Sequence, residues 1–113
     1  MRIEIKGRNV VVSDELRERA EKRFAKISRQ VSPLARLELE LSEERNPSIR
    51  ESQVAEATLY LKGATLRARD SAESMLHAIN LVEKELSRQV KRHREKRRRR
   101  REIARAHARA VAP

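Results

Sequence analysis

The sequence predicts an α+β protein with the order β-α-β-β-β-α, in which two helices cover one face of a four-stranded mixed sheet. Three observations lead to this prediction. Two segments, near residues 14–31 and 71–96, place apolar residues at intervals of three or four, as a helix with one buried side does. Four other segments alternate apolar and polar residues, as half-buried strands do. With 113 residues, the chain can form one modest core but not two.

The first strand and the first helix are expected within residues 1–32. Arg2–Lys6 alternates polar and apolar residues and predicts a strand. Ser13 is suited to cap a helix, because its hydroxyl can accept a free backbone N–H, and acidic residues follow in the first turn. Pro33 ends this helix. Its predicted buried stripe consists of Leu16, Ala20, Phe24, Ile27 and Val31.

Three further strands are expected between residues 36 and 69. Leu37, Leu39 and Leu41 alternate with glutamates and predict the second strand, and the segment 46–48, Asn-Pro-Ser, predicts a turn. The third strand is expected at 53–62. Gly63 then makes a tight connection to a fourth strand at 64–69, with Leu66 and Ala68 pointing inward. A right-handed crossover makes the first two strands parallel, and short connections make the others antiparallel. The second face of this sheet is expected to be polar.

The second helix is expected to be much longer than the sheet. Asp70 or Ser71 could cap it, and Glu73 would complete a capping box with Asp70. The predicted buried stripe consists of Met75, Ile79, Val82, Leu86 and Val90. Even if the helix ended at Arg101 it would span about 46 Å, against about 23 Å for a seven-residue strand. About half of the helix must therefore project, which predicts a domain at 1–96 and a basic Arg/Ala-rich extension at 97–113. This extension could be helical, disordered or a linker.

Positive charge is concentrated at the C-terminal end. The net charge is +11, yet residues 1–87 hold 16 Lys/Arg against 15 Asp/Glu, whereas residues 88–113 hold 12 against two. Such an end favours a dense polyanion, either nucleic acid or an anionic membrane surface. A solubilising tail is the alternative, but solubility does not require the six consecutive basic residues of 96–101. No signal peptide and no membrane-spanning stretch is predicted.

Basic residues of both helices are the candidate binding site. On the second helix, four of them lie opposite the buried stripe, and Arg94 and Lys96 continue this basic ridge toward the C-terminus. On the first helix they follow Glu21, after which acidic residues stop. The candidates are Lys22, Arg23, Lys26, Arg29, Lys84, Arg88, Lys91, Arg92, Arg94 and Lys96. If six to ten side chains reach phosphates, affinity should fall by about 10³ to 10⁵ between 50 and 200 mM salt.

Other kinds of site find little support in the sequence. The only aromatic residues are Phe24, in the predicted core, and Tyr60, which alone cannot form a platform on which several bases stack. Recognition is therefore expected to depend on phosphates and RNA shape. The three histidines, His77, His93 and His107, are dispersed and expected at the surface. The chain has no cysteine and no phosphate-binding glycine motif, so we expect no catalysis, no cofactor and no metal site.

Two segments resemble a known family. Residues 21–27, EKRFAKI, resemble the run E-K-K/R-F-A-K/R-L/I in the first helix of the ribosome hibernation promoting factor and ribosome-associated inhibitor family. Residues 75–80, MLHAIN, and 86–94, LSRQVKRHR, resemble that family's M-Y-x-A-I-D and L-x-R-Q-L/V-x-K-x-K/R in the second helix. The resemblance covers about residues 1–96. Leu76 and Asn80 depart from the pattern, so neither is a candidate.

The resemblance implies a non-catalytic cytoplasmic protein that binds the small ribosomal subunit, in the channel of messenger and transfer RNA near the decoding centre. Such proteins block initiation and preserve idle ribosomes in stationary phase or stress. The positions carried over as contacts to ribosomal RNA are Lys22, Arg23, Lys26, Arg29, Arg88, Lys91, Arg92 and Arg94. Gln89 also matches, although packing explains it equally well. The chain would be a short-type member, a fragment of a long one, or a variant with a different tail, and a monomer in isolation.

Two other functions remain open at the level of the sequence. The first is a general RNA-binding or RNA-chaperone protein without ribosome specificity, which would use the same basic residues. The second is a regulator that acts through a protein partner, with the nearly neutral body as its contact surface. No small-molecule substrate and no membrane association is expected in any of these cases.

Overall fold

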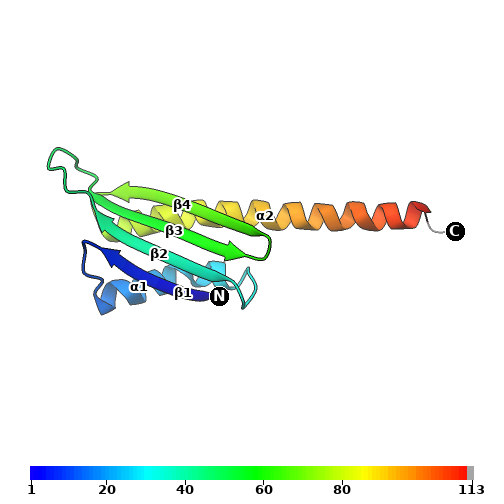
Figure 1. The fold of residues 1–113 in the computed structure, drawn as a ribbon, viewed down its shortest axis with the longest axis horizontal. Helices are drawn as coiled ribbons and strands as arrows, with labels where there is room; N and C mark the ends of the chain where they lie inside the picture. Colours follow the sequence, from blue (N-terminus) through cyan, green and yellow to red (C-terminus); the bar gives the residue numbers. More distant parts are fainter. Residues whose placement is uncertain (112–113) are drawn as a thin grey trace.

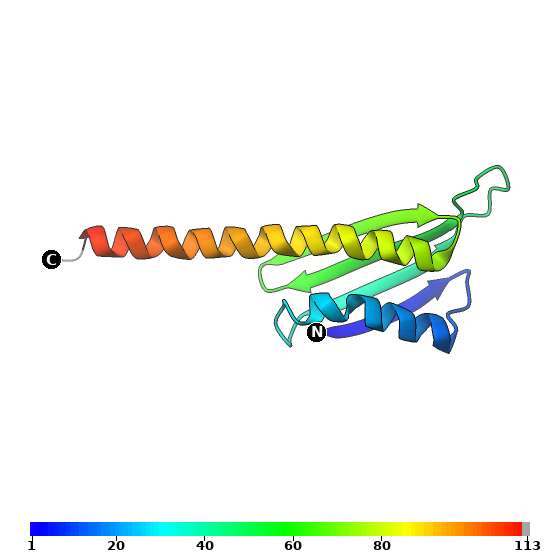
Figure 2. The same cartoon turned by 180° about the vertical axis from the view of Figure 1, so that it is seen from behind.

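The computed structural model describes residues 1–111 and has the predicted order β-α-β-β-β-α. The elements are β1 (Arg2–Arg8), α1 (Asp14–Ser28), β2 (Arg36–Glu43), β3 (Gln53–Leu61), β4 (Ala64–Ala72) and α2 (Met75–Val111). The strand order is β1-β2-β3-β4, with β1 and β2 parallel and the other pairs antiparallel. Both helices lie on one face of the sheet, and α2 extends far past it (Figures 1 and 2). The predicted fold is confirmed.

The start of α1 is as predicted, but its end comes earlier. The Ser13 hydroxyl accepts the backbone N–H of Leu16 at 3.1 Å, which caps the first turn. At the other end, Gln30 N–H bonds to the Ile27 carbonyl in a tightened last turn, and the helix stops at Ser28. The prediction that Val31 belongs to the helix is therefore wrong. Val31 packs against the core from the following loop, because the chain must turn back to begin β2.

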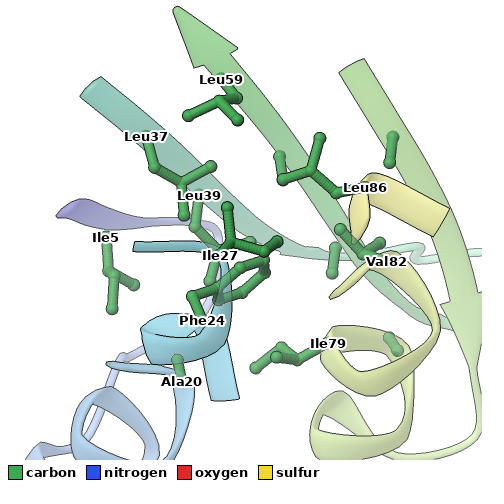
Figure 3. Close-up of a cluster of buried hydrophobic side chains, with 14 of the residues drawn as sticks. Ile5, Ala20, Phe24, Ile27, Leu37, Leu39, Leu59, Ile79, Val82 and Leu86 are labelled. Carbon is green, nitrogen blue, oxygen red and sulfur yellow. The ribbon is translucent and has the colours of Figure 1, made fainter. Parts of the chain in front are cut away.

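The core lies between the helices and the sheet. The alternating leucines of β2, together with Phe24 and Ile27 of α1, are fully buried. Figure 3 labels most of these side chains, all except Leu41, beside Ile79, Val82 and Leu86, which α2 contributes over β3 and β4. The predicted stripes thus form a single core, with Met75 at its margin.

Two connections have a clear local cause. Asn9 has φ 59°, and its side chain hydrogen-bonds to both the N–H and the C=O of Glu43, at 2.9 and 2.8 Å. These two hydrogen bonds extend the pairing of β1 with β2 by one residue beyond Arg8. Gly63, with φ 77°, lies in the two-residue loop between β3 and β4, in a region of backbone space that favours glycine. The predicted tight connection at Gly63 is confirmed.

The predicted cap of α2 is wrong. Asp70 and Ser71 belong to β4, which continues to Ala72 and pairs with β3 up to Gln53. If α2 began at Asp70, these residues would lose their backbone hydrogen bonds to β3, and Ala72 would lose its buried position in the sheet. Ser74 caps the helix instead, since its hydroxyl accepts the N–H of His77 at 3.2 Å.

The basic half of α2 projects beyond the sheet. The helix continues without a break to Val111. Residues 97–111 are therefore helical, which is one of the three possibilities (helix, disorder or linker) that the sequence left open. This projection makes the molecule elongated, with extents of 69 × 28 × 17 Å. The division into a domain at 1–96 and an extension at 97–113 remains a prediction.

Candidate nucleic-acid interface

A basic groove runs between α1 and α2. Its volume is about 480 Å³. Five of the ten candidate residues meet there: Lys22, Arg23, Lys26, Lys84 and Arg88. Fixed cations along one groove are suited to binding successive phosphates of a nucleic acid backbone.

The packing of the two helices explains why these side chains meet. On α1, Phe24 and Ile27 enter the core, which leaves Lys22 and Lys26, four residues apart, exposed. On α2, Val82 and Leu86 enter the core, and Lys84 and Arg88 are exposed with the same spacing. The two pairs lie more than 50 residues apart in sequence and share a groove only because both helices pack on the same sheet.

Arg23 is held by a buried carboxylate. Its Nε lies 3.2 Å from Oε2 of Glu83, whose side chain is only 7% exposed. The Ser87 hydroxyl donates to the other Glu83 oxygen at 2.9 Å. Arg23 therefore joins α1 to α2 as well as lining the groove. The sequence prediction did not include Glu83. Its place next to Val82 in the buried stripe does indicate an ion pair, because a buried carboxylate needs a cation and the first helix has basic residues but no acid after Glu21.

Replacement of Arg23 by leucine should lower the free energy of unfolding by about 1 to 3 kcal/mol, because the Glu83 carboxylate stays buried without its partner. The larger losses of stability that follow when a fully buried ion pair is broken are not expected, because the Arg23 side chain is 38% exposed and water screens its charge. Urea denaturation would measure the change. The double variant R23L/E83L should regain most of the loss, and Lys22→Leu should lose little. An R23L protein as stable as the parent would contradict this role.

A second basic cluster lies where α2 passes the end of α1. Gln30 lines a groove of about 510 Å³ together with Lys91 and Arg94 of the predicted site. Arg97, Arg98 and Arg101 of the projecting helix line the same groove. Glu95 is the one acid in this lining, against five cations. The predominantly cationic surface therefore extends along α2 onto the projection. Arg29, exposed just after α1, lines neither groove.

Arg92 and Lys96 lie on the opposite flank of α2, above β4, where they line a hollow with Gln89 and Leu66. Glu85 pairs with Arg88 at 3.1 Å and with Arg92 at 4.0 Å. The Gln89 amide donates to the backbone carbonyl of Arg67 at 2.7 Å, which satisfies a free acceptor on the edge strand. Of the two roles considered for Gln89, the structure supports packing.

The prediction that His93 lies at the surface is wrong. This residue is half-buried, and its Nε2 is buried without a hydrogen-bond partner among residues 1–111. Its position on α2, three residues after the buried Val90, turns it toward the end of the sheet. His77 and His107 are exposed, as predicted.

The other face of the sheet is less suited to a polyanion. Glu38, Glu40 and Glu56 lie on adjacent strands near its centre, in line with the predicted polar face. The guanidinium of Arg36 covers the Tyr60 ring at 4.5 Å, and the Tyr60 hydroxyl donates to Glu38 at 3.3 Å. Carboxylates at the centre would repel phosphates, so the helical side is the favourable one.

Fold and surface together define a small α+β protein with a basic face built by two helices. The family described as "Sigma 54 modulation protein / S30EA ribosomal protein" matches residues 3–98, and the chain belongs to this family. The family is one of non-catalytic ribosome hibernation factors.

Curated relatives agree with this assignment. The chain is 30% identical over 96 residues to the ribosome hibernation promoting factor of Azotobacter vinelandii, covering 85% of each chain. It is 28% identical over 97 residues to the ribosome hibernation promotion factor of Picosynechococcus sp., which includes 85% of this chain but 50% of that one. The chain thus spans about half the length of some relatives, including the one from Lactococcus lactis, at 49%.

Solved structures show the same fold. The N-terminal domain of Protein Y from Thermus thermophilus has a TM-score of 0.70 and 26% identity, covering 82% of this chain and 99% of that one. A ribosomal subunit interface protein from Coxiella burnetii has a TM-score of 0.68 over 84% of this chain and 99% of that one, and its 20% identity supports the fold alone. Within residues 1–111, no helix is both long and apolar enough to cross a membrane.

Proposed function

We propose that this protein is a ribosome hibernation factor that binds the RNA of the small ribosomal subunit in the mRNA-tRNA channel near the decoding centre. The observation that carries the proposal is the basic groove between α1 and α2, where five residues chosen from the sequence line one surface. Family membership and the names of the relatives support the ribosome as the partner. A protein held there would exclude messenger and transfer RNA without performing chemistry, in the cytoplasm and as a monomer before it binds.

The proposed contacts divide by position. Lys22, Lys26, Lys84 and Arg88 would bind phosphates in the groove, and Lys91 and Arg94 would extend the track toward the projecting helix. Arg23 would contribute while it stays paired with Glu83. Arg92 and Lys96 would meet RNA on the other flank of α2, and Arg29 would add attraction from the end of α1.

Co-sedimentation with purified small subunits at 100 mM salt tests the partner. We expect the protein to pellet with them, to resist competition by excess transfer RNA, and to inhibit translation in a cell-free system. Failure to pellet would refute the proposal. Complete removal by excess transfer RNA would favour the general RNA-binding alternative, since such a protein prefers no particular RNA.

Occupancy of the channel tests the location. Small subunits loaded beforehand with messenger RNA and initiator transfer RNA should bind the protein at least about tenfold more weakly than empty subunits, because both ligands would compete for one space. Chemical footprinting of the small-subunit RNA would show which nucleotides are protected. Equal binding to loaded and empty subunits would contradict a site in the channel.

A chain ending at Lys96 should keep ribosome binding but lose affinity. Residues 97–113 carry seven Lys/Arg and one acid, so their removal takes away a net charge of +6. We expect affinity for small subunits to fall at least about tenfold at 100 mM salt, with a shallower salt dependence. Resistance to transfer RNA should remain, because the groove is retained.

A full-length variant with glutamine at positions 97–101 is the matched control for that truncation. It keeps the length of the helix and loses five charges, so it should resemble the truncated chain if charge is the cause. If the truncated chain loses all binding while the glutamine variant binds normally, the projection acts through its length or shape instead.

A further inference from the structure

An apolar hollow lies at the end of the sheet where α2 leaves it, apart from the groove between the helices. Its volume is about 700 Å³, within the range typical of small-ligand sites. Val31 and Leu34 from the loop after α1, Leu61 from the end of β3, and Val90 from α2 provide apolar walls. Leu34 is 94% exposed, an unusual position for a large apolar side chain in a chain that is 40% charged.

The charges around the hollow are all positive. Its thirteen lining residues include four cations and no carboxylate. These cations are Arg36, Lys62, Arg94 and Arg97. Arg36 is already engaged, because its guanidinium covers the Tyr60 ring. An apolar protein segment or a lipid tail would fit the walls but would offer no negative charge to Lys62, Arg94 and Arg97. A ligand with an apolar surface attached to a negative charge uses both.

His93 lines both this hollow and the one above β4, and its side chain holds a buried polar atom without a partner among residues 1–111. This atom is the Nε2 of the imidazole ring. A polar edge of a ligand at this wall would offset the cost of that unsatisfied nitrogen. Arg94 and Arg97 line both this hollow and the neighbouring basic groove, so the two surfaces are continuous.

We propose that this hollow binds one unstacked base of a single-stranded RNA segment, while Arg94 and Arg97 hold the phosphates on either side. A base has two apolar faces, a hydrogen-bonding edge and an attached phosphate, which match the walls, His93 and the arginines in turn. The inference rests on the proposed function and adds to it a second mode of recognition. The sequence predicted recognition by phosphates and shape alone, because it showed no aromatic platform.

The test compares two exposed apolar residues. Leu34→Glu places a carboxylate in the mouth of the hollow, whereas Val11→Glu makes the same change at a residue that is 92% exposed in the connection between β1 and α1. That connection lies at the opposite end of the sheet (Figure 1). Because both side chains are almost fully exposed, neither change should impair folding, which circular dichroism and thermal melting would verify.

The probe is a ten-nucleotide single-stranded RNA of mixed sequence that carries one 4-thiouridine, with a duplex of the same length for comparison. We expect L34E to bind the single strand at least about tenfold more weakly than V11E, and the duplex within about threefold of V11E, because bases in a duplex stay stacked. Ultraviolet irradiation should crosslink the thiouridine to peptides containing Leu34, Leu61 or His93 in the parent protein.

Three results would overturn the inference. Equal binding of single-stranded RNA by L34E and V11E, or crosslinks confined to the groove between α1 and α2, would overturn the inference. Loss of duplex binding to the same degree as single-strand binding would also overturn it, because the effect would then be one of charge alone. Parent protein that pellets with small subunits in any of these cases leaves the proposed function intact, whereas parent protein that fails to pellet refutes that function separately.

Discussion

Charge reversal of Lys26, Lys84 and Arg88 to glutamate should weaken binding to small ribosomal subunits by about a hundredfold or more. All three side chains are exposed and line the groove between α1 and α2. Each lost phosphate contact should also lower the slope of log affinity against log salt by about 0.7 to 0.9, so three contacts lower it by about 2 to 3. Sedimentation at 50, 100 and 200 mM salt would measure both quantities.

A triple reversal at Arg8, Arg45 and Arg50 is the matched control. These arginines are also exposed, and the change in net charge is the same. Arg8 is the last residue of β1, and Arg45 and Arg50 belong to the connection between β2 and β3. These segments lie at the end of the sheet opposite the projecting helix (Figure 1). If the groove is the interface, the control should lose less than about fivefold. Equal losses in the two variants would show that net charge, rather than the groove, governs binding.

Replacement of Phe24 by alanine should lower the free energy of unfolding by about 3 to 5 kcal/mol. Phe24 is fully buried, and Figure 3 shows it between α1, β2 and the first turns of α2. The loss combines the transfer of the ring with the cavity left behind. Because a domain of this size is stable by only about 5 to 15 kcal/mol, urea denaturation should show a large shift of the midpoint.

Two controls separate burial from side-chain size. Phe24→Leu should cost clearly less than Phe24→Ala, since most of the volume is kept. Val11→Ala removes apolar atoms from a side chain that is 92% exposed and should change stability by about 0.5 kcal/mol or less. A Phe24→Ala protein within about 1 kcal/mol of the parent would mean that α1 is not held by this core.

The Arg23–Glu83 pair matters both for the measurements of RNA binding and for the measurements of stability. Arg23 lines the groove and also forms an ion pair with the buried acid, so its replacement should change stability as well as binding. Lys22 and Lys26 are exposed and have no ion pair within 4 Å among residues 1–111. Their replacement should change binding alone, and a comparison with Arg23 therefore separates an RNA contact from a structural one.

Elements whose residues follow a regular period could be predicted from the sequence. The leucines of β2 and the stripe of α1 from Leu16 to Ile27 lie where their spacing places them, because burial on one side requires that spacing. Errors fell at the ends of elements, at Val31 and at the boundary between β4 and α2. There, Ser71 and Ser74 are equally good caps by residue type, and only pairing with β3 selects Ser74.

The candidate site was predicted in part. The basic residues follow from charge and helical spacing, but their grouping does not. Glu83 lies 60 positions from Arg23 and meets it only because α1 and α2 pack side by side on one sheet. The hollow near His93 combines a loop, the end of a strand and a helix. No local pattern in the sequence indicates such a meeting.

The sequence by itself determined the order of the elements, the buried face of each helix and the excess of positive charge near the C-terminus. These properties depend on residues close together in the chain, where spacing and composition decide which side can leave water. The tertiary structure decided that α1 and α2 form a groove, that Glu83 holds Arg23, and that α2 passes over an apolar hollow. Those features depend on contacts between distant segments, which form only when the shared core brings both helices onto one face of the sheet.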